Sequence, residues 1–238
     1  MPDFFVRSTD AEIMDDLEYS GEMMDRTLYE LELINKWLGG NDVTLGGIKQ
    51  MVMSHDPNET VCIADLGCGR GDILRLISRW AKKENRKVRL IGIDANPYIV
   101  DAARTNLSQY PDIELQTMNI FSAAFQSMKF DIVLGTLFYH HFSNQQLQTF
   151  FRQLKDQVRI GFIINDIHRH AMAFYSIQFL TKYFSRSSMV KFDAPLSVLR
   201  AFTRTELIEI LRDAGAQIFT IQWKWAFRWQ VLVYKSKN

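Results

Sequence analysis

The chain has 238 residues, of which 47% are hydrophobic and 23% charged, so it can bury the core of one α/β domain with an appended segment. Lys and Arg number 28 and Asp and Glu number 27, and the net charge of +1 gives no electrostatic basis for binding nucleic acid. The 2 cysteines form neither a metal-binding spacing nor a disulfide framework, and the amino terminus lacks the apolar core of an export signal. We therefore expect a cytoplasmic protein with reduced thiols.

The first segment of the chain is predicted to be helical. Ser20 is expected to cap a helix that ends at Gly39–Gly40, and a shorter helix is expected from Leu45 to Met53. We interpret residues 1–55 as an amino-terminal helical cap, which either packs on the edge of a sheet or forms a lid over a ligand. Residues 56–238 then form the main domain.

A strand, a tight loop and a helix are predicted where the sequence reads VCIADLGCGRGD. An apolar run ends on Asp65, and Gly67, Gly69 and Gly71 follow at alternate positions. Glycines permit positive φ and a close approach of a ligand to the backbone, and the helix that follows presents free N–H groups. The spacing differs from the G-x-G-x-x-G of dinucleotide-binding loops. We predict that a small molecule binds at this loop.

The remaining elements alternate between strands and helices. After the strand Val88–Asp94, Asn96 is expected to cap a helix that starts at Pro97. Two capping boxes, Ser143 with Gln146 and Thr203 with Glu206, predict where later helices begin. The other strands are expected at Ile113–Met118, Phe130–Gly135, Gln157–Asn165, Ile218–Trp223 and Trp229–Tyr234. The pattern is typical of an α/β sheet that ends in a hairpin.

Histidines follow two of the predicted strands. His140 and His141 lie in the loop after the fourth strand, and His168 lies just after the fifth, next to Asp166 and Ile167. Open parallel sheets bind ligands outside the carboxyl ends of their strands, so the first loop is expected to face a reacting group. An imidazole with a pKa near 6.5 is suited to take a proton there. A purely structural role for each histidine is the alternative.

Residues 167–202 form a connection far longer than is usual between a strand and a helix. The segment carries six aromatic residues: Phe174, Tyr175, Phe179, Tyr183, Phe184 and Phe192. We interpret this insert as a cover over a pocket for an apolar or aromatic ligand. One alternative is a simple core helix. A minor alternative is an interfacial helix that admits a lipid-like ligand from a membrane.

The D-x-G-x-G-x-G loop that starts at Asp65, followed by a strand ending in Asp94, resembles the motifs of class I S-adenosylmethionine (SAM) dependent methyltransferases. The resemblance implies a seven-stranded Rossmann-like sheet with helices on both faces, a helical lid at the amino terminus and a helical insert after the fifth strand. It implies that Gly67, Gly69 and Gly71 pass under the methionine and ribose of SAM. Asp94 would bind the ribose hydroxyls, and Asp65 would organise the loop or hold the methionine ammonium.

The sequence departs from that family at one position. Many of its members place an Asp after the third strand to receive the adenine amino group, whereas this chain has Asn119, whose carbonyl is a neutral acceptor. The predicted SAM-binding residues are Asp65, Gly67, Cys68, Gly69, Gly71, Asp94, Ala95, Asn119, Ile120 and Leu137. The predicted catalytic residues are His140, His141 and His168, and no metal ligands are predicted.

Further motifs resemble those of bacterial small-molecule methyltransferases. Residues 134–142 are similar to the loop of quinone-biosynthesis-like enzymes. Residues 13–16, 34–40, 166–170 and 194–203 resemble methyltransferases often found beside type III polyketide synthases. The resemblance implies transfer of a methyl group to a small apolar or aromatic acceptor, with a phenolic or polyketide-like hydroxyl as the leading case.

The sequence leaves two other functions open. They are methylation of a carbon on a quinone-like ring, and a SAM-binding protein without transfer. A nicotinamide oxidoreductase is disfavoured by the loop spacing. We expect a small-molecule acceptor as the partner, no nucleic acid, and a monomer or homodimer.

Overall fold

The computed structural model describes residues 2–236 and shows one seven-stranded sheet with the strand order β3-β2-β1-β4-β5-β7-β6. The strands are β1 (Val61–Leu66), β2 (Val88–Asp94), β3 (Ile113–Thr117), β4 (Phe130–Thr136), β5 (Val158–Ile167), β6 (Ile218–Lys224) and β7 (Arg228–Tyr234). The first five are parallel, and β7 runs antiparallel to both β5 and β6. The predicted α/β fold and its terminal hairpin are confirmed.

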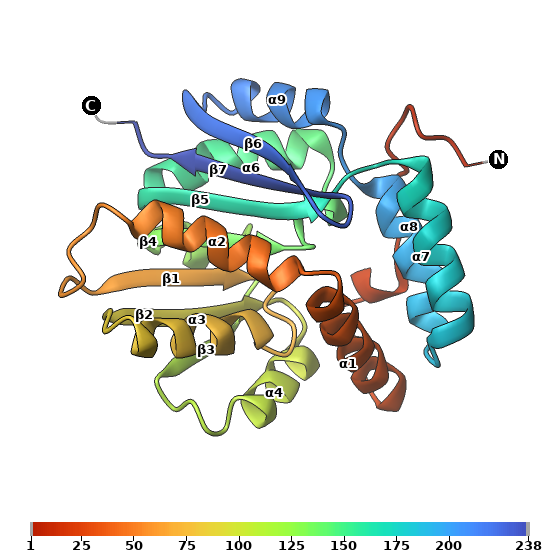
Figure 1. Ribbon diagram of the computed structural model, residues 1–238, viewed down its shortest axis with the longest axis horizontal. Helices are drawn as coiled ribbons and strands as arrows, with labels where there is room; N and C mark the ends of the chain where they lie inside the picture. The colour runs from red at the N-terminus through yellow and green to blue at the C-terminus, as the bar shows by residue number, and fades with distance from the viewer. Residues whose placement is uncertain (1, 237–238) are drawn as a thin grey trace.

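Helices cover both faces of the sheet (Figure 1). They are α1 (Glu22–Trp37), α2 (Gly40–Val52), α3 (Asp72–Lys83), α4 (Pro97–Asn106), α5 (Ala123–Ser127), α6 (Asn144–Gln157), α7 (Ala171–Phe184), α8 (Ser188–Arg200) and α9 (Arg204–Asp213). One core lies between the sheet and α2 and α3, and a second lies between the sheet and α5, α6 and α9. The core-facing side chains of α3 recur at helical spacing, at Ile73, Leu74 and Ile77, because only one stripe of that helix meets the sheet.

Most helix starts follow the local signals in the sequence. Asn96 accepts from the N–H of Tyr98, with Pro97 at the first position of α4, and both predicted capping boxes are present. Ser20 was the wrong cap for α1. The N-cap is Gly21, whose φ of +92° brings the chain into the helix through a conformation that serine would adopt only with strain.

The amino-terminal helix and the insert lie together beyond the carboxyl ends of the parallel strands (Figure 1). The insert forms two helices, α7 and α8, which pack against each other, and α1 contacts α8. A short 3-10 turn, η1 (Ile13–Asp15), also contacts α8. None of the helices within residues 2–236 is both long and apolar enough to cross a lipid bilayer.

Candidate active site

The glycine loop is held in a conformation that requires its glycines. Gly67, Gly69 and Gly71 have φ values of +63°, +51° and +75°. The N–H of Gly69 donates to Asp94 Oδ2 at 3.4 Å, and the N–H of Cys68 donates to the carbonyl of Ile93 at 3.2 Å. These bonds tie the loop to the end of β2, so the two acid-bearing strand ends form one site.

Two glycine substitutions in the loop should have different effects. A Cβ on Gly67 would lie 2.3 Å from Phe138 Cδ2, whereas a Cβ on Gly69 would meet no atom within 4 Å. We expect Gly67→Ala to lower the free energy of unfolding by about 2–4 kcal/mol, from left-handed strain and displacement of the ring. Gly69→Ala should cost only the strain, about 1–2 kcal/mol. Denaturant unfolding of both variants checks this, and equal losses would contradict it.

Three carboxylates gather around the loop, which favours a cationic ligand. Burial, and then the nearby carboxylates of Asp72 and Asp94, raises the pKa of Asp65 well above its ordinary value. Burial also raises the pKa of Asp94, against the lowering effect of backbone N–H donors that include that of Gly69. Burial, followed by Glu32, raises the pKa of Asp72. Neighbouring carboxylates disfavour one another's charge, so a bound cation would relieve the repulsion among them.

A cavity of about 440 Å³ begins at this loop and continues to the insert. Asp65, Gly67 and Gly69 of the loop line it, and so do His140 and His141. Apolar residues of α1, α7 and α8 line the rest, among them Leu28, Leu31, Ile177, Leu180, Val190 and Val198. The volume lies within the range of small-ligand pockets. One cavity therefore joins the predicted cofactor loop to the predicted acceptor cover.

The insert contributes to the lining of this cavity. The aromatic side chains that led us to predict a cover, however, do not line it. Tyr175, Phe179 and Tyr183 are exposed on the outer side of α7, and Phe184 and Phe192 are exposed as well. The sixth, Phe174, is buried in a small cluster with Ala173 and Val198. The helices turn their smaller aliphatic residues towards the cavity, which leaves an apolar lining without rings from the insert.

His140 is buried and held by a carboxylate at the carboxyl end of β5. Its Nδ1 lies 2.7 Å from Asp166 Oδ1, and Asp166 Oδ2 accepts the N–H groups of Tyr139 and His140 at 2.9 and 3.1 Å. Burial raises the pKa of Asp166, but the interaction with His140 outweighs it and leaves that pKa below its ordinary value. The carboxylate thus fixes both the ring and the turn that carries it.

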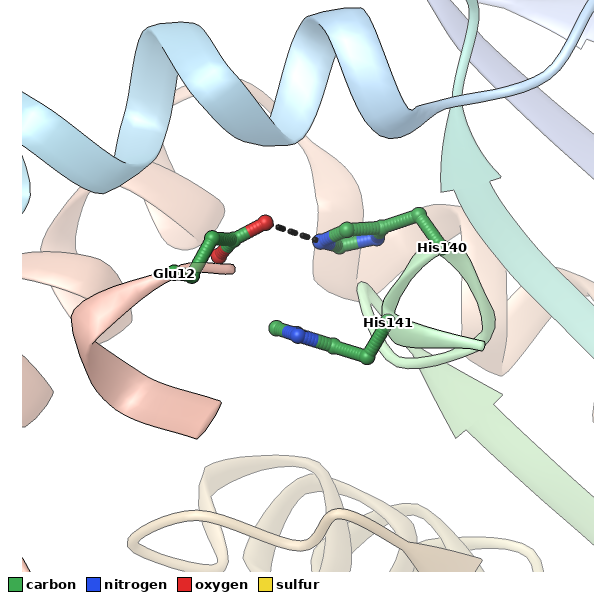
Figure 2. A group of neighbouring side chains, drawn as sticks. All are labelled: Glu12, His140 and His141. Atoms are coloured by element: carbon green, nitrogen blue, oxygen red, sulfur yellow. Dashed lines mark ion pairs between the residues drawn. The ribbon is translucent and has the colours of Figure 1, made fainter. Parts of the chain in front are cut away.

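The other ring nitrogen of His140 faces Glu12, a residue from the amino-terminal segment (Figure 2). Glu12 Oε1 lies 3.6 Å from His140 Nε2 and 3.6 Å from Arg200 Nη1. Burial raises the pKa of Glu12 to about 7, against the lowering effects of His141 and Arg200. The ring of His141 lies beside that of His140, with 4.3 Å between the centroids, and its Nδ1 is 2.7 Å from Asp15 Oδ1.

Arg7 stabilises the 3-10 turn Tyr139–His141, which carries both histidines and is called the histidine turn below. Its Nη2 donates to the carbonyls of His140 and Phe142 at 3.1 and 3.0 Å, and its guanidinium lies 4.3 Å from the ring centroid of Phe202. Burial lowers the pKa of Arg7 to about 10. The amino-terminal segment therefore contributes both a wall of the cavity and a brace for the turn.

The third predicted catalytic residue, His168, is not among the residues that line the cavity. Its ring packs 4.7 Å from the ring of Trp229, and burial, with His170 and Arg169, lowers its pKa. His140 and His141 do line the cavity. The structure thus brings together two of the three candidates, and all three roles remain predictions.

Five of the ten predicted SAM-binding residues line the cavity, and the other five do not. Asp65, Gly67, Cys68, Gly69 and Leu137 line the cavity. Gly71 packs on Leu107, where an added Cβ would lie 2.4 Å from Leu107 Cδ1. Asp94 and Ala95 lie at the end of β2, Ile120 is buried, and Asn119 is exposed with its Oδ1 accepting the N–H of Phe121 at 2.8 Å.

Further polar residues that the sequence did not indicate reach the cavity, among them Glu12, Asn35, Asp72 and Arg228. Each has a buried polar atom without a hydrogen-bond partner among the described residues: Glu12 Oε1, Asn35 Oδ1, Asp72 Oδ2 and Arg228 Nε. Asp72 directly follows the last glycine of the loop and begins α3, so its sequence position could have indicated that it lies at the ligand site. The others come from distant segments and share no local pattern.

The central part of the chain is similar to a known protein family. Residues 63–161 match the family described as a methyltransferase domain. No curated protein sequence matches the chain. Among solved structures, the plantazolicin methyltransferase BpumL in complex with a triazolic desmethylPZN analog and SAH has a TM-score of 0.68 at 14% identity, with 89% of this chain and 91% of that chain covered.

Two larger proteins contain a similar fold. Human N-acetylserotonin methyltransferase in complex with SAM has a TM-score of 0.63 at 14% identity, with 91% of this chain and 57% of that chain covered. The CMeT domain of the citrinin polyketide synthase has a TM-score of 0.62 at 15% identity, with 82% and 52% covered. At these identities the likeness establishes the shared fold.

Proposed function

Since this chain carries a class I, SAM-dependent methyltransferase domain, we propose that it transfers the methyl group of SAM to a hydroxyl of a small apolar or aromatic acceptor. The observation that most supports this acceptor is the single cavity that runs from the glycine loop past the histidine turn to an apolar end. Donor and acceptor must share a closed space for direct transfer, because the reacting oxygen, carbon and sulfur have to align without intervening water.

The polar end of the cavity suits the cofactor. SAM carries a positive sulfonium and a positive ammonium. The carboxylates of Asp65 and Asp72 line the cavity, and the carboxylate of Asp94 lies beside the loop, where it accepts the N–H of Gly69, so all three offer the opposite charge. Arg228 is buried in the cavity wall with its Nε unpaired, so it can receive the methionine carboxylate. We expect Asp94, at the end of β2, to accept the ribose hydroxyls.

The apolar end suits the acceptor. A hydroxyl on an apolar or aromatic acceptor would lie against α7 and α8 with its oxygen near His140 and His141. SAM, when bound, would supply the methyl group: the hydroxyl proton would pass to a histidine of this turn or to water, the oxygen would bond to the methyl carbon, and the broken carbon–sulfur bond would leave S-adenosylhomocysteine. Residues 1–55 would then act as the lid over this reaction, because α1 and Glu12 contribute to the cavity wall.

Loss of the Asp94 carboxylate should weaken cofactor binding. Removing hydrogen bonds to a charged acceptor costs about 1.5–3 kcal/mol, so Asp94→Ala should raise the Kd for SAM on the order of 10- to 100-fold. Titration calorimetry with SAM measures this, and Asp101→Ala, an exposed change on α4, serves as the control. An Asp94→Ala variant with the parent affinity would contradict the assignment of Asp94.

Incubation with labelled SAM and a panel of phenols and aliphatic alcohols then tests the acceptor class. Transfer to phenols by the parent, and reduced transfer by Asp94→Ala at low SAM concentration, is the expected result. Tight binding of SAM with no transfer to any acceptor would instead support a binding protein without transferase activity. Transfer only to a ring carbon would replace the hydroxyl acceptor by a quinone-like one.

A further inference from the structure

The group formed by Glu12, His140 and His141 has the composition of a metal site. Each residue offers one ligand atom, and the three atoms lie within 4.8 Å of one another. Two imidazole nitrogens and one carboxylate oxygen form a donor set that suits zinc and similar divalent transition ions, and catalytic zinc sites use three such protein ligands with one position left open. Figure 2 shows the three side chains converging from two distant segments of the chain.

The second ring nitrogen of each histidine is held by a carboxylate. His140 Nδ1 pairs with Asp166 Oδ1, and His141 Nδ1 pairs with Asp15 Oδ1, both at 2.7 Å. In metal sites a carboxylate in this position fixes the ring and raises the basicity of the opposite nitrogen. Both imidazoles are thus oriented with Nε2 as the remaining free nitrogen. A single catalytic histidine needs only one such histidine–carboxylate pair, whereas this site has two.

Two of the ligand atoms have no hydrogen-bond partner within residues 2–236. His140 Nε2 and Glu12 Oε1 are buried, make no hydrogen bond among the described residues, and lie 3.6 Å apart, beyond hydrogen-bond distance. An unpaired buried polar atom is costly, so a pair of them facing one another calls for a bridging group. A separation of 3.6 Å suits two ligands of one tetrahedral ion, which lie about 3.4 Å apart at metal–ligand distances near 2.1 Å.

The local charge also favours a cation. Glu12, Asp15 and Asp166 bring three carboxylates to the two imidazoles, and Arg200 supplies a guanidinium that pairs with Asp15 at 2.5 Å. A surplus of negative charge remains, which a dipositive ion would offset. The guanidinium lies 3.6 Å from Glu12 Oε1, so it would compete with the ion for that oxygen.

We propose that Glu12, His140 and His141 bind a divalent transition ion, with Zn²⁺ as the leading case, at the wall of the acceptor cavity. All three residues line that cavity, so the open position of the ion faces the acceptor. The role of the ion rests on the proposed function: the acceptor oxygen binds it, the hydroxyl proton leaves to water, and the resulting oxyanion attacks the methyl carbon while the carbon–sulfur bond breaks.

Zinc binding can be measured without any methyl acceptor. Protein freed of metal with a chelator is titrated with ZnCl₂ by calorimetry, and bound metal is counted by mass spectrometry after dialysis. We expect one Zn²⁺ per chain and no comparable binding of Mg²⁺, which prefers oxygen ligands. Glu12→Gln and His141→Asn should each weaken Zn²⁺ binding on the order of 100-fold.

Matched controls separate this site from the cofactor site and from misfolding. His168→Asn makes the same change at a histidine outside the cavity and should bind Zn²⁺ like the parent. SAM affinity and thermal unfolding should be unchanged in His141→Asn, which is only partly buried. No zinc uptake by the parent, or equal uptake by His141→Asn, would overturn the proposal and would leave methyl transfer itself untouched.

Discussion

His140→Asn should lower the turnover of methyl transfer by about two to four orders of magnitude, the range that a positioned group acting on the proton of a reacting oxygen contributes. Asparagine keeps an N–H donor near the position of Nδ1, so the bond to Asp166, 2.7 Å in the parent, can persist. What the substitution removes is Nε2, the nitrogen that faces Glu12 and the cavity. The same loss is expected whether this nitrogen takes the proton itself or holds an ion that assists its departure.

The design of this experiment depends on two companion variants. His141→Asn keeps a donor towards Asp15 and should also lower turnover. His55→Asn should leave turnover within about twofold, because His55 follows α2 and is not among the residues that line the cavity. The Kd for SAM should be unchanged in all three, since none of these side chains belongs to the glycine loop. Full turnover in both His140→Asn and His141→Asn would remove the histidine turn from the reaction.

The sequence predicted those parts of the site that depend on local structure. The glycines at alternate positions, the acids that end β1 and β2, and the two histidines after β4 are close in sequence to the strand ends that place them. In a parallel sheet all such ends meet at one edge, so a strand prediction is also a prediction of proximity. The helix caps were predictable for the same reason, because a cap bonds within three residues.

The rest of the site depends on contacts between distant segments. Glu12 meets His140 across 128 positions, and Arg228 reaches the cavity from the start of the last strand. Such a contact cannot be predicted from the periodicity of the sequence, because a single buried charged residue creates no repeating pattern. The aromatic residues of α7 show the opposite error: their number suggested a pocket lining, but which face of an amphipathic helix is buried depends on its neighbours, and here the aliphatic face lines the cavity.

A large loss of stability is expected from Arg169→Met. The guanidinium of Arg169, 3% exposed, pairs with Glu206 at 2.6 Å and donates to the carbonyls of Ala201 and Phe4 at 2.6 and 3.0 Å. It therefore joins the end of β5, the amino-terminal segment, the end of α8 and the start of α9. Removing one partner of a buried ion pair costs about 3–5 kcal/mol, and the lower end applies because Glu206 is half-buried.

Denaturant unfolding of Arg169→Met and of Arg204→Met gives the comparison, because Arg204 is exposed at the start of α9 and its loss should change the free energy of unfolding by less than about 0.5 kcal/mol. Measurement against pH adds a second test. Burial raises the pKa of Glu206, but Arg169 and the hydrogen bonds from Thr203 together outweigh burial and hold that pKa below its ordinary value of 4.5. Such a carboxyl stabilises the fold above pH 4.5 and loses that contribution as the pH falls through its lowered pKa. The parent should therefore lose stability more steeply than Arg169→Met below pH 4.5, and equal acid slopes would show that the pair contributes nothing.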